Sequence, residues 1–296
     1  MNAPFEIKRA LLFAALALTL APGAHAAAVE KSSADALPEA AAASANPGDG
    51  LNGKEIYEKV LDNRFDAYIE ELTMHSGDRG GNVQDTEMQV KYLNFRKQSD
   101  RILSKAIMKY HAPQDVRHLG YLVINKEDGS EDQFVYRPSS RRVQRINLRG
   151  EAIFGTDFAF EDIIPQELED ATYERLPDSD VNGTPVYTVE VTPKEEQDSE
   201  YSKFDVYTSQ DTFVALRVIY WDQDGLKIKE LNSDPTSIKM YEHEEEEGLK
   251  QIWIAEKQKI VHLKLDSWTE LVITKYDADV KLRSRDFSER ELTKGR

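Results

Sequence analysis

Two neighbouring segments alternate apolar and polar residues over an unusual length, and this pattern limits the possible folds most strongly. In residues 86–97, Met88, Val90 and Tyr92 alternate with charged and amide side chains. In residues 102–110, Met108 and Tyr110 lie opposite lysines, and Ile102 and Ala106 continue the apolar side. A period of two is typical of a strand with one buried face. Two such long strands predict a large curved antiparallel sheet with one apolar face.

Most of the remaining chain also reads as strands joined by turns. One early helix is expected, because apolar residues between 56 and 61 recur at helical spacing. Asp128-Gly129 and Asp224-Gly225 separate strand-like runs and predict hairpins. Further strands are expected at 120–125, 133–137, 142–146, 185–192, 203–208, 213–221, 226–232, 238–242, 251–266 and 268–276. Residues 115–118 and 153–168 lack strict alternation and are expected to form short helices over the open face.

The first 26 residues have the organisation of a secretory signal peptide. Two basic residues, Lys8 and Arg9, precede an apolar stretch from 10 to 21, and Ala24-His25-Ala26 supplies the small residues of a cleavage site. The apolar stretch is shorter than the ~20 residues that a membrane-spanning helix needs. We therefore expect cleavage after Ala26 and a protein that is soluble in the periplasm.

Composition narrows the class of protein further. The 296 residues contain no cysteine, which excludes disulfides and lipid anchoring through a cysteine. Residues 27–50 are rich in Ala, Ser and Pro, and we expect a flexible linker there, followed by a single domain at 51–296. The formal net charge of −16 disfavours nucleic acid and anionic membrane surfaces as partners.

No catalytic or metal-binding motif stands out. The histidines form no H-E-x-x-H motif, so we expect no zinc site, and no cofactor is expected. The acidic run at 244–247 lacks the Asp/Asn/Gly alternation of a calcium loop. No G-x-S-x-G elbow, Walker loop or Rossmann glycine pattern is present. Glu161 and Asp162 have the chemistry for acid–base work, but adjacent acids more commonly stabilise a helix start.

Residues 134–162 combine apolar, basic and acidic side chains in one stretch. An aromatic run that includes Phe134 and Tyr136 precedes several arginines, and further aromatics with acids follow. Apolar groups beside cations suit the binding of an amphiphile, because the apolar groups contact its tail and the cations contact its acidic head. Two interpretations remain open for Arg141, Arg142 and Arg145. They contact a headgroup or a partner, or they form ion pairs with acids on the surface.

The same stretch resembles the LolA-like outer-membrane lipoprotein-sorting proteins, in the branch often encoded beside RND-type exporters. The family pattern is a Y-x-P strand, a basic RR-x-x-RI stretch and F-x-G-x-D-F-x-x-E-D. It is matched by Tyr136, Pro138, Arg141, Arg142, Arg145, Ile146, Gly155, Asp157, Phe158, Glu161 and Asp162, with Phe154 directly before Gly155 instead of two residues before it. Thr156 stands where the family often has serine, and a closing F-x-x-R-x-L is met by Phe287, Arg290 and Leu292. The resemblance implies an incomplete antiparallel β-barrel with helices as a lid over a hydrophobic cavity.

The resemblance also implies a function. It indicates a soluble periplasmic carrier, expected to be a monomer, that shields acyl chains of lipoproteins or lipids and passes them toward the outer membrane. An inner-membrane transporter, with the RND type as a candidate, would load it. One alternative is an accessory protein of an RND-type exporter that handles a hopanoid-like or wax-like lipid. Two others are a hydrolase of envelope lipids and a structural protein with a ligand-free sheet.

The expected ligand site has three parts and no catalytic residue. An apolar cavity wall is predicted at Met88, Val90, Tyr92, Ile102, Met108, Tyr110, Phe134, Tyr136, Phe154, Phe158 and Phe160, where methionine adapts to varied acyl chains. The three arginines at 141, 142 and 145 are the predicted contacts for a headgroup or partner. Residues 153–168 are predicted to act as a gate, with Gly155 for the turn and Asp157, Glu161 and Asp162 near a helix start.

Overall fold

The computed structural model describes residues 50–99, 101–147, 150–163 and 166–294. The expected signal peptide, and the linker apart from Gly50, lie outside these residues. No helix of the described part of the chain is long and apolar enough to cross a membrane.

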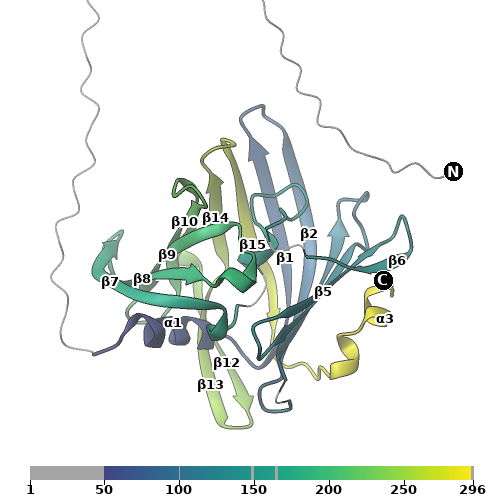
Figure 1. The fold of residues 1–296 in the computed structure, drawn as a ribbon, viewed down its shortest axis with the longest axis horizontal. Helices are drawn as coiled ribbons and strands as arrows, with labels where there is room; N and C mark the ends of the chain where they lie inside the picture. The colour runs from purple at the N-terminus through teal and green to yellow at the C-terminus, as the bar shows by residue number, and fades with distance from the viewer. Residues whose placement is uncertain (1–49, 100, 148–149, 164–165, 295–296) are drawn as a thin grey trace, which may run out of the picture. The chain divides into compact units, whose positions relative to one another are not determined.

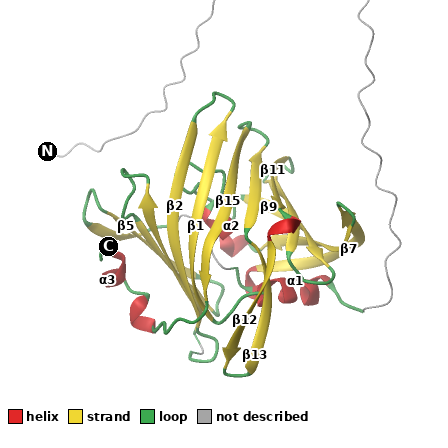
Figure 2. Cartoon of the chain, turned by 180° about the vertical axis from the view of Figure 1, so that it is seen from behind, coloured by secondary structure: helices red, strands yellow, loops and turns green. Residues whose placement is uncertain are grey.

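Antiparallel strands form one large curved sheet (Figures 1 and 2). Its strands are β1 (Ala67–Asp78), β2 (Val83–Asn94), β3 (Ile102–Ala112), β4 (Gly120–Lys126), β5 (Glu131–Arg137), β6 (Arg142–Arg145), β7 (Ala171–Val181), β8 (Thr184–Pro193), β9 (Tyr201–Ser209), β10 (Ala215–Asp222), β11 (Lys227–Ser233), β14 (Lys257–His262) and β15 (Ser267–Asp277). A separate hairpin contains β12 (Ile238–Glu245) and β13 (Gly248–Ala255). The helices are α1 (Gly53–Asp62), α2 (Phe160–Ile163) and α3 (Glu289–Leu292), with 3-10 turns at Leu168–Asp170, Glu195–Gln197, Pro235–Ser237 and Ser284–Asp286.

The order of strands explains how the apolar face becomes covered. Across the sheet the order is β6-β5-β4-β3-β2-β1-β15-β14-β11-β10-β9-β8-β7. The terminal strands β6 and β7 do not pair, so the sheet is not closed into a barrel. These two strands follow each other in the chain but lie at opposite ends of the sheet. In the described part of the connection between them, residues 150–163 and 166–170, the chain passes over one face of the sheet.

The sheet has apolar side chains on both faces. We call the inner face the one that carries the largest buried cluster, to which strands along most of the sheet, from β1 to β15, contribute. A smaller cluster on the outer face joins Leu93, Ile107 and Leu122 to the C-terminal segment through Phe287 and Leu292. The two C-terminal apolar positions of the sequence motif thus cover the back of the sheet.

Helix α1 forms and docks for local reasons. Asn52 caps it, and the Glu55 carboxylate accepts a hydrogen bond from the Asn52 amide in return, which satisfies two end groups of the helix. Ile56 and Tyr57 are buried against the inner cluster. A Cβ at Gly53 would lie 2.7 Å from the Arg175 nitrogen of β7, so glycine is what allows the helix start to approach that strand.

The predicted class, a mainly β fold with an incomplete antiparallel barrel, is confirmed, but several elements differ. The strand expected at 251–266 is two strands, because the chain leaves the hairpin at Glu256 and enters the main sheet as β14. Residues 115–118 form turns rather than a helix, in a tight connection between β3 and β4. Two strands were not predicted, namely β1 and the edge strand β7, where Pro177 and many polar residues hide the pattern.

Ile102 does not share the face of Met108, contrary to the prediction. A β-bulge separates Ile102 from Ser104 in the pairing of β3 with β4. One extra residue in a strand moves the side chains beyond it to the opposite face. Ile102 therefore packs with the outer cluster, and the strict alternation holds only from residue 104 onward.

Candidate functional site

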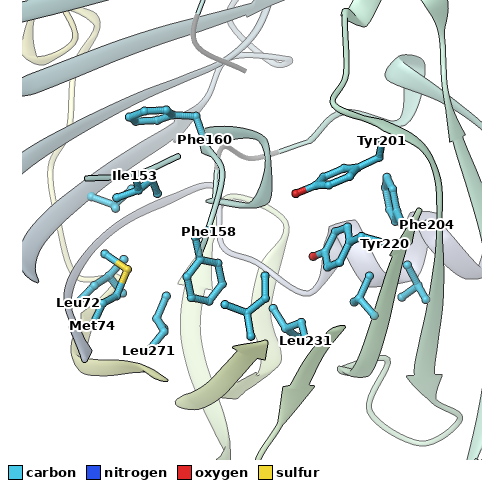
Figure 3. Close-up of a cluster of buried hydrophobic side chains, with 14 of the residues drawn as sticks. Leu72, Met74, Ile153, Phe158, Phe160, Tyr201, Phe204, Tyr220, Leu231 and Leu271 are labelled. Carbon is cyan, nitrogen blue, oxygen red and sulfur yellow. The ribbon is translucent and has the colours of Figure 1, made fainter. Parts of the chain in front are cut away.

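A short segment with large apolar side chains lies on the inner face. We call residues 151–163 the strap; they belong to the connection between β6 and β7. The side chains of Ile153, Phe158 and Phe160 are 0%, 1% and 2% exposed, and all three belong to the inner cluster. In Figure 3 the strap stands between side chains from the two halves of the sheet. The strap therefore covers part of the apolar inner face.

Phe158 is the central contact of the strap. Figure 3 shows its ring pointing into the cluster that also holds Met74, Leu231 and Leu271. Phe160 contacts the sheet elsewhere, with its ring centroid 4.3 Å from that of Tyr121. Burial of three such side chains contributes roughly 5–9 kcal/mol, at about 1.5–3 kcal/mol each. Apolar contact is thus a major force holding the strap in place.

Part of the strap's backbone is folded on itself. The Ile153 amide donates to the Phe158 carbonyl at 2.8 Å, and the Phe160 amide donates to the Glu151 carbonyl at 3.0 Å. Gly155 makes the turn with a φ of +70°, a conformation that glycine adopts without strain. The turn directs Phe154 outward, where it is 40% exposed. The expectation that Phe154 covers the apolar face is therefore wrong.

One end of the strap is tied to β15 by Asp157. Its amide donates to the Thr269 hydroxyl at 2.9 Å, and its carboxylate lies 2.8 Å from the same hydroxyl. Ser267 donates to the other carboxylate oxygen. These contacts are buried, with Asp157 8% and Thr269 0% exposed. The position that the sequence assigned to the motif thus anchors the strap to the sheet.

The other end of the strap is held by its two adjacent acids. Glu161 accepts hydrogen bonds from the Ser199 hydroxyl at 2.6 Å and from the Glu200 amide at 2.9 Å. Asp162 accepts one from the Ala159 amide at 2.7 Å, which places its carboxylate at the start of α2. This geometry supports the interpretation of these acids as helix-start residues and gives them a structural use.

Asp162 also reaches a buried cation that the sequence analysis did not single out. The Tyr201 hydroxyl donates to Asp162 at 3.0 Å, and the Lys229 ammonium donates to that hydroxyl at 2.9 Å. The Lys229 nitrogen lies 3.9 Å from Asp162 and 3.6 Å from the Glu200 carboxylate. The side chains of Lys229 and Asp162 are only 4% and 1% exposed. An ion pair this deeply buried is costly to form and needs its hydrogen bonds to persist.

Burial raises the pKa of Asp162 to about 6, although nearby Lys229 acts in the opposite direction. Because this pKa exceeds the ordinary 3.8, the folded chain binds the proton more tightly than the unfolded chain. The stabilisation is fully present below the ordinary pKa and is lost as pH rises through about 6. Burial, with Lys229, lowers the pKa of His262, whose contribution to stability therefore changes with pH in the opposite sense.

The structure brings some predicted cavity residues together with the strap. Met88, Val90, Met108 and Tyr110 are at most 1% exposed and lie in the inner cluster. The Tyr110 hydroxyl also accepts a hydrogen bond from the Phe154 amide at 3.3 Å. These four side chains share the inner cluster with Ile153, Phe158 and Phe160 of the strap, and their role toward a ligand stays a prediction.

Other predicted cavity residues lie elsewhere. Phe134 and Tyr136 pack with Ile102 in the outer cluster, because in β5 it is Val135 that faces inward. Tyr92 is buried near the C-terminal end of β2, where its ring stacks on Tyr68 at a centroid distance of 5.1 Å. Those positions are separated from the strap by the sheet itself or by distance along a strand.

The three arginines lie in and beside the β5–β6 hairpin and do not gather at the strap. Arg145 forms an ion pair with Asp132 of β5, which favours the surface-pairing interpretation for this residue. Arg141 sits in the turn with a φ of +51°, and both it and Arg142 are exposed. Within the described residues, no group of three or more His, Asp or Glu side chains is placed to hold a metal ion.

Lys229 and Tyr201 carried no usable sequence signal. Lys229 follows Lys227 in an alternating strand, a pattern that predicts a solvent-facing row of lysines. In the sheet, however, Lys229 pairs across with Tyr220 and with His262, beside the inner-face pair Leu231 and Ile260. Only the register of β10, β11 and β14 reveals that this cation points inward.

The fold is that of LolA-like proteins. A structure from Vibrio parahaemolyticus described as an outer membrane lipoprotein-sorting protein domain matches with a TM-score of 0.70 and 23% identity, over 82% of this chain and 98% of that chain. A DUF1329 family protein from Desulfovibrio piger matches with a TM-score of 0.67 and 21% identity, over 81% and 98%. A LolA superfamily protein from Nitrosomonas europaea gives 0.62 and 16%, over 81% and 99%.

Sequence comparison adds a family assignment. A family profile with the description "Uncharacterized protein" matches residues 102–294, and the chain belongs to this family. A search of curated proteins finds no match. The resemblance to LolA-like lipoprotein-sorting proteins is therefore confirmed through the structural relatives, at the level of the fold.

Proposed function

We propose that this protein is a periplasmic carrier that binds acyl chains of lipoproteins or other lipids on the inner face of its sheet, in the place of the strap. The observation that carries the proposal is the strap itself, whose three buried apolar side chains occupy the inner face. Hydrogen bonds within the strap, such as Ile153 to Phe158 and Phe160 to Glu151, keep it folded as one unit. Its hydrogen bonds to the sheet through Asp157, and to the segment before β9 and to Tyr201 through Glu161 and Asp162, have to break when it leaves. The LolA-like fold supports the same assignment.

The energies of exchange are comparable. Three buried apolar side chains of the strap contribute roughly 5–9 kcal/mol, and each buried CH₂ group of an acyl chain contributes about 0.8 kcal/mol. An acyl chain that buries about 6–11 methylenes therefore compensates for loss of the strap's apolar contacts. The hydrogen bonds of Asp157 and Asp162 to the sheet add to the cost of opening. Met74, Met88 and Met108 on the inner face have flexible side chains that adapt to chains of different shape.

Transfer follows from the same exchange. A bound acyl chain leaves when the strap returns to the inner face, so no nucleotide or covalent step is required of this chain. We propose that an inner-membrane transporter loads the carrier and that the cargo moves toward the outer membrane. The carboxylates of Glu161 and Asp162, which a hydrolase would need free, are engaged by Ser199, the Glu200 amide and Tyr201.

The test is calorimetric titration with matched cargo models. A diacylated lipopeptide is expected to bind, and the same peptide without its acyl chains is not. A wax ester in a third titration tests the alternative that a non-protein lipid is the cargo. Lack of binding by every acylated probe would refute the carrier and favour a structural protein, and release of free fatty acid during the titration would indicate a hydrolase.

A further inference from the structure

The strap carries the chemistry of the ligand that it would be exchanged for. Phe158 and Phe160 supply apolar groups, and Asp162, close behind them, supplies a carboxylate. That carboxylate is delivered to Lys229 and Tyr201 at the inner face. In the closed protein the strap therefore resembles an acidic amphiphile, with the apolar part on the inner cluster and the acid against a buried cation.

Lys229 belongs to the sheet and stays when the strap leaves. Its partners in the register, Tyr220 and His262, come from β10 and β14, and the Tyr201 hydroxyl comes from β9. The ring of Tyr201 lies 5.2 Å from the ammonium. Displacement of the strap removes one carboxylate from this cation. Among the residues that the structure describes, it leaves Glu200, whose side chain is 31% exposed, as the remaining acid within 4 Å.

Binding a hydrocarbon chain does not involve a buried cation, and apolar docking of the strap does not involve the Asp162 carboxylate. The Lys229–Asp162 pair is explained if the cargo also carries an acidic group, because Lys229 then has an acidic partner in both the closed and the ligand-bound protein. We propose that Lys229 and Tyr201 form a binding site for the single acidic group of an acyl ligand, which takes the place of the Asp162 carboxylate. This proposal rests on the proposed function and names the headgroup class of its cargo.

Two kinds of amphiphile share this chemistry, a free fatty acid with its carboxylate and a phosphate-bearing lysolipid. The experiment uses a neutral fluorescent reporter, methyl cis-parinarate, on the full mature protein. Palmitic acid and methyl palmitate compete for the reporter in one pair of titrations, and palmitoyl lysophosphatidic acid and palmitoyl lysophosphatidylcholine compete in the other. Each pair matches the chain and differs in the net charge of the head.

The wild-type protein is expected to prefer the acidic member of at least one pair by about tenfold or more, as a hydrogen bond to a charged group implies. The pair that shows the preference identifies the acid as carboxylate or phosphate. Lys229→Met is expected to abolish the preference for the acidic competitor without weakening binding of the neutral reporter. Lys259→Met, which removes a lysine paired with Glu270 on the outer side, is the matched control and should keep the preference.

Lys229→Met leaves Asp162 buried without its cation, so a second variant guards against misfolding. The double variant Lys229→Met with Asp162→Asn has neither charge at this site and should likewise show no preference. Equal competition by acidic and neutral probes in the wild type, or a preference that persists in both variants, would overturn the acidic-headgroup site while leaving the carrier intact. Failure of the wild type to bind the reporter and all four competitors would count against the carrier function itself.

Discussion

Replacing Phe158 with alanine tests whether the strap exchanges with a ligand or is a fixed part of the core. The side chain is 1% exposed in the inner cluster, and removal of a buried phenylalanine side chain costs about 3–5 kcal/mol. If ligand replaces the strap, this cost falls on the closed state alone, because the ligand-bound state does not use Phe158. Phe158→Ala should therefore lower the free energy of strap opening and tighten the apparent affinity for an acyl probe.

The size of the effect follows from the competition between strap and ligand. The apparent affinity is reduced by the fraction of molecules that are open. A loss of about 3 kcal/mol from the closed state raises that fraction by about 150-fold while the closed state still dominates. The gain is smaller once the open state becomes the major one. The assay is a fluorescence titration with cis-parinaric acid, with a thermal melt of each protein.

Phe65→Ala is the matched control. Phe65 is also 1% exposed, but it lies between α1 and β1, where its ring contacts His243 and Tyr276. Both variants should melt at lower temperature than the wild type, and only Phe158→Ala should bind the probe more tightly. Unchanged or weaker binding by Phe158→Ala, or equal tightening by both variants, would show that the strap is permanent core and would refute the exchange.

Four further outcomes are expected. A bound acyl probe should increase hydrogen exchange in residues 151–163 more than at Val189 in β8, measured by mass spectrometry; equal exchange in both states would contradict gating. Asp162→Asn should remove a loss of stability of about 1.4 kcal/mol between pH 5 and pH 8, as pH rises through a pKa of about 6, measured from denaturant midpoints at those two pH values; an unchanged pH profile would count against ionisation of this buried acid. Leu292→Ala on the outer face should lower the free energy of unfolding by about 2–5 kcal/mol without weakening binding of the acyl probe. Weaker binding by this variant would indicate that the ligand binds on the outer face. Mass spectrometry of the exported protein should give a chain that begins at Ala27, and a retained leader would contradict the cleavage site.

The strand pattern was readable because period-two alternation is a local property. Met88, Val90 and Met108 were assigned to one buried face from the sequence, and they lie together in the inner cluster. The same reasoning failed where one residue breaks the period. The bulge before Ser104 turned Ile102 outward, and no local signal in the sequence announces such a shift.

The strap was recognised as a candidate gate from its aromatics and acids, but its form was not predicted. Gly155 directs the turn, and the turn decides which aromatic faces the sheet, so Phe158 is buried while Phe154 is exposed. The arginines were more prominent in the sequence than Lys229, yet the structure places Arg145 with Asp132 and brings Lys229 to the strap. The residues that stand out in the sequence motif are therefore not the ones that the fold brings together at the strap.

The sequence by itself determined the antiparallel sheet with an apolar face and the stretch of the chain that lies over this face. These features depend on residues near one another in the chain, through alternation and turn preference. The tertiary structure decided which residues meet across the sheet. β6 and β7 are neighbours in sequence and lie at opposite ends of the strand order, and residues 151–163 of the connection between them cross the inner face. That crossing brings Asp162 to Lys229, a pairing over long sequence separation that only strand order and register define.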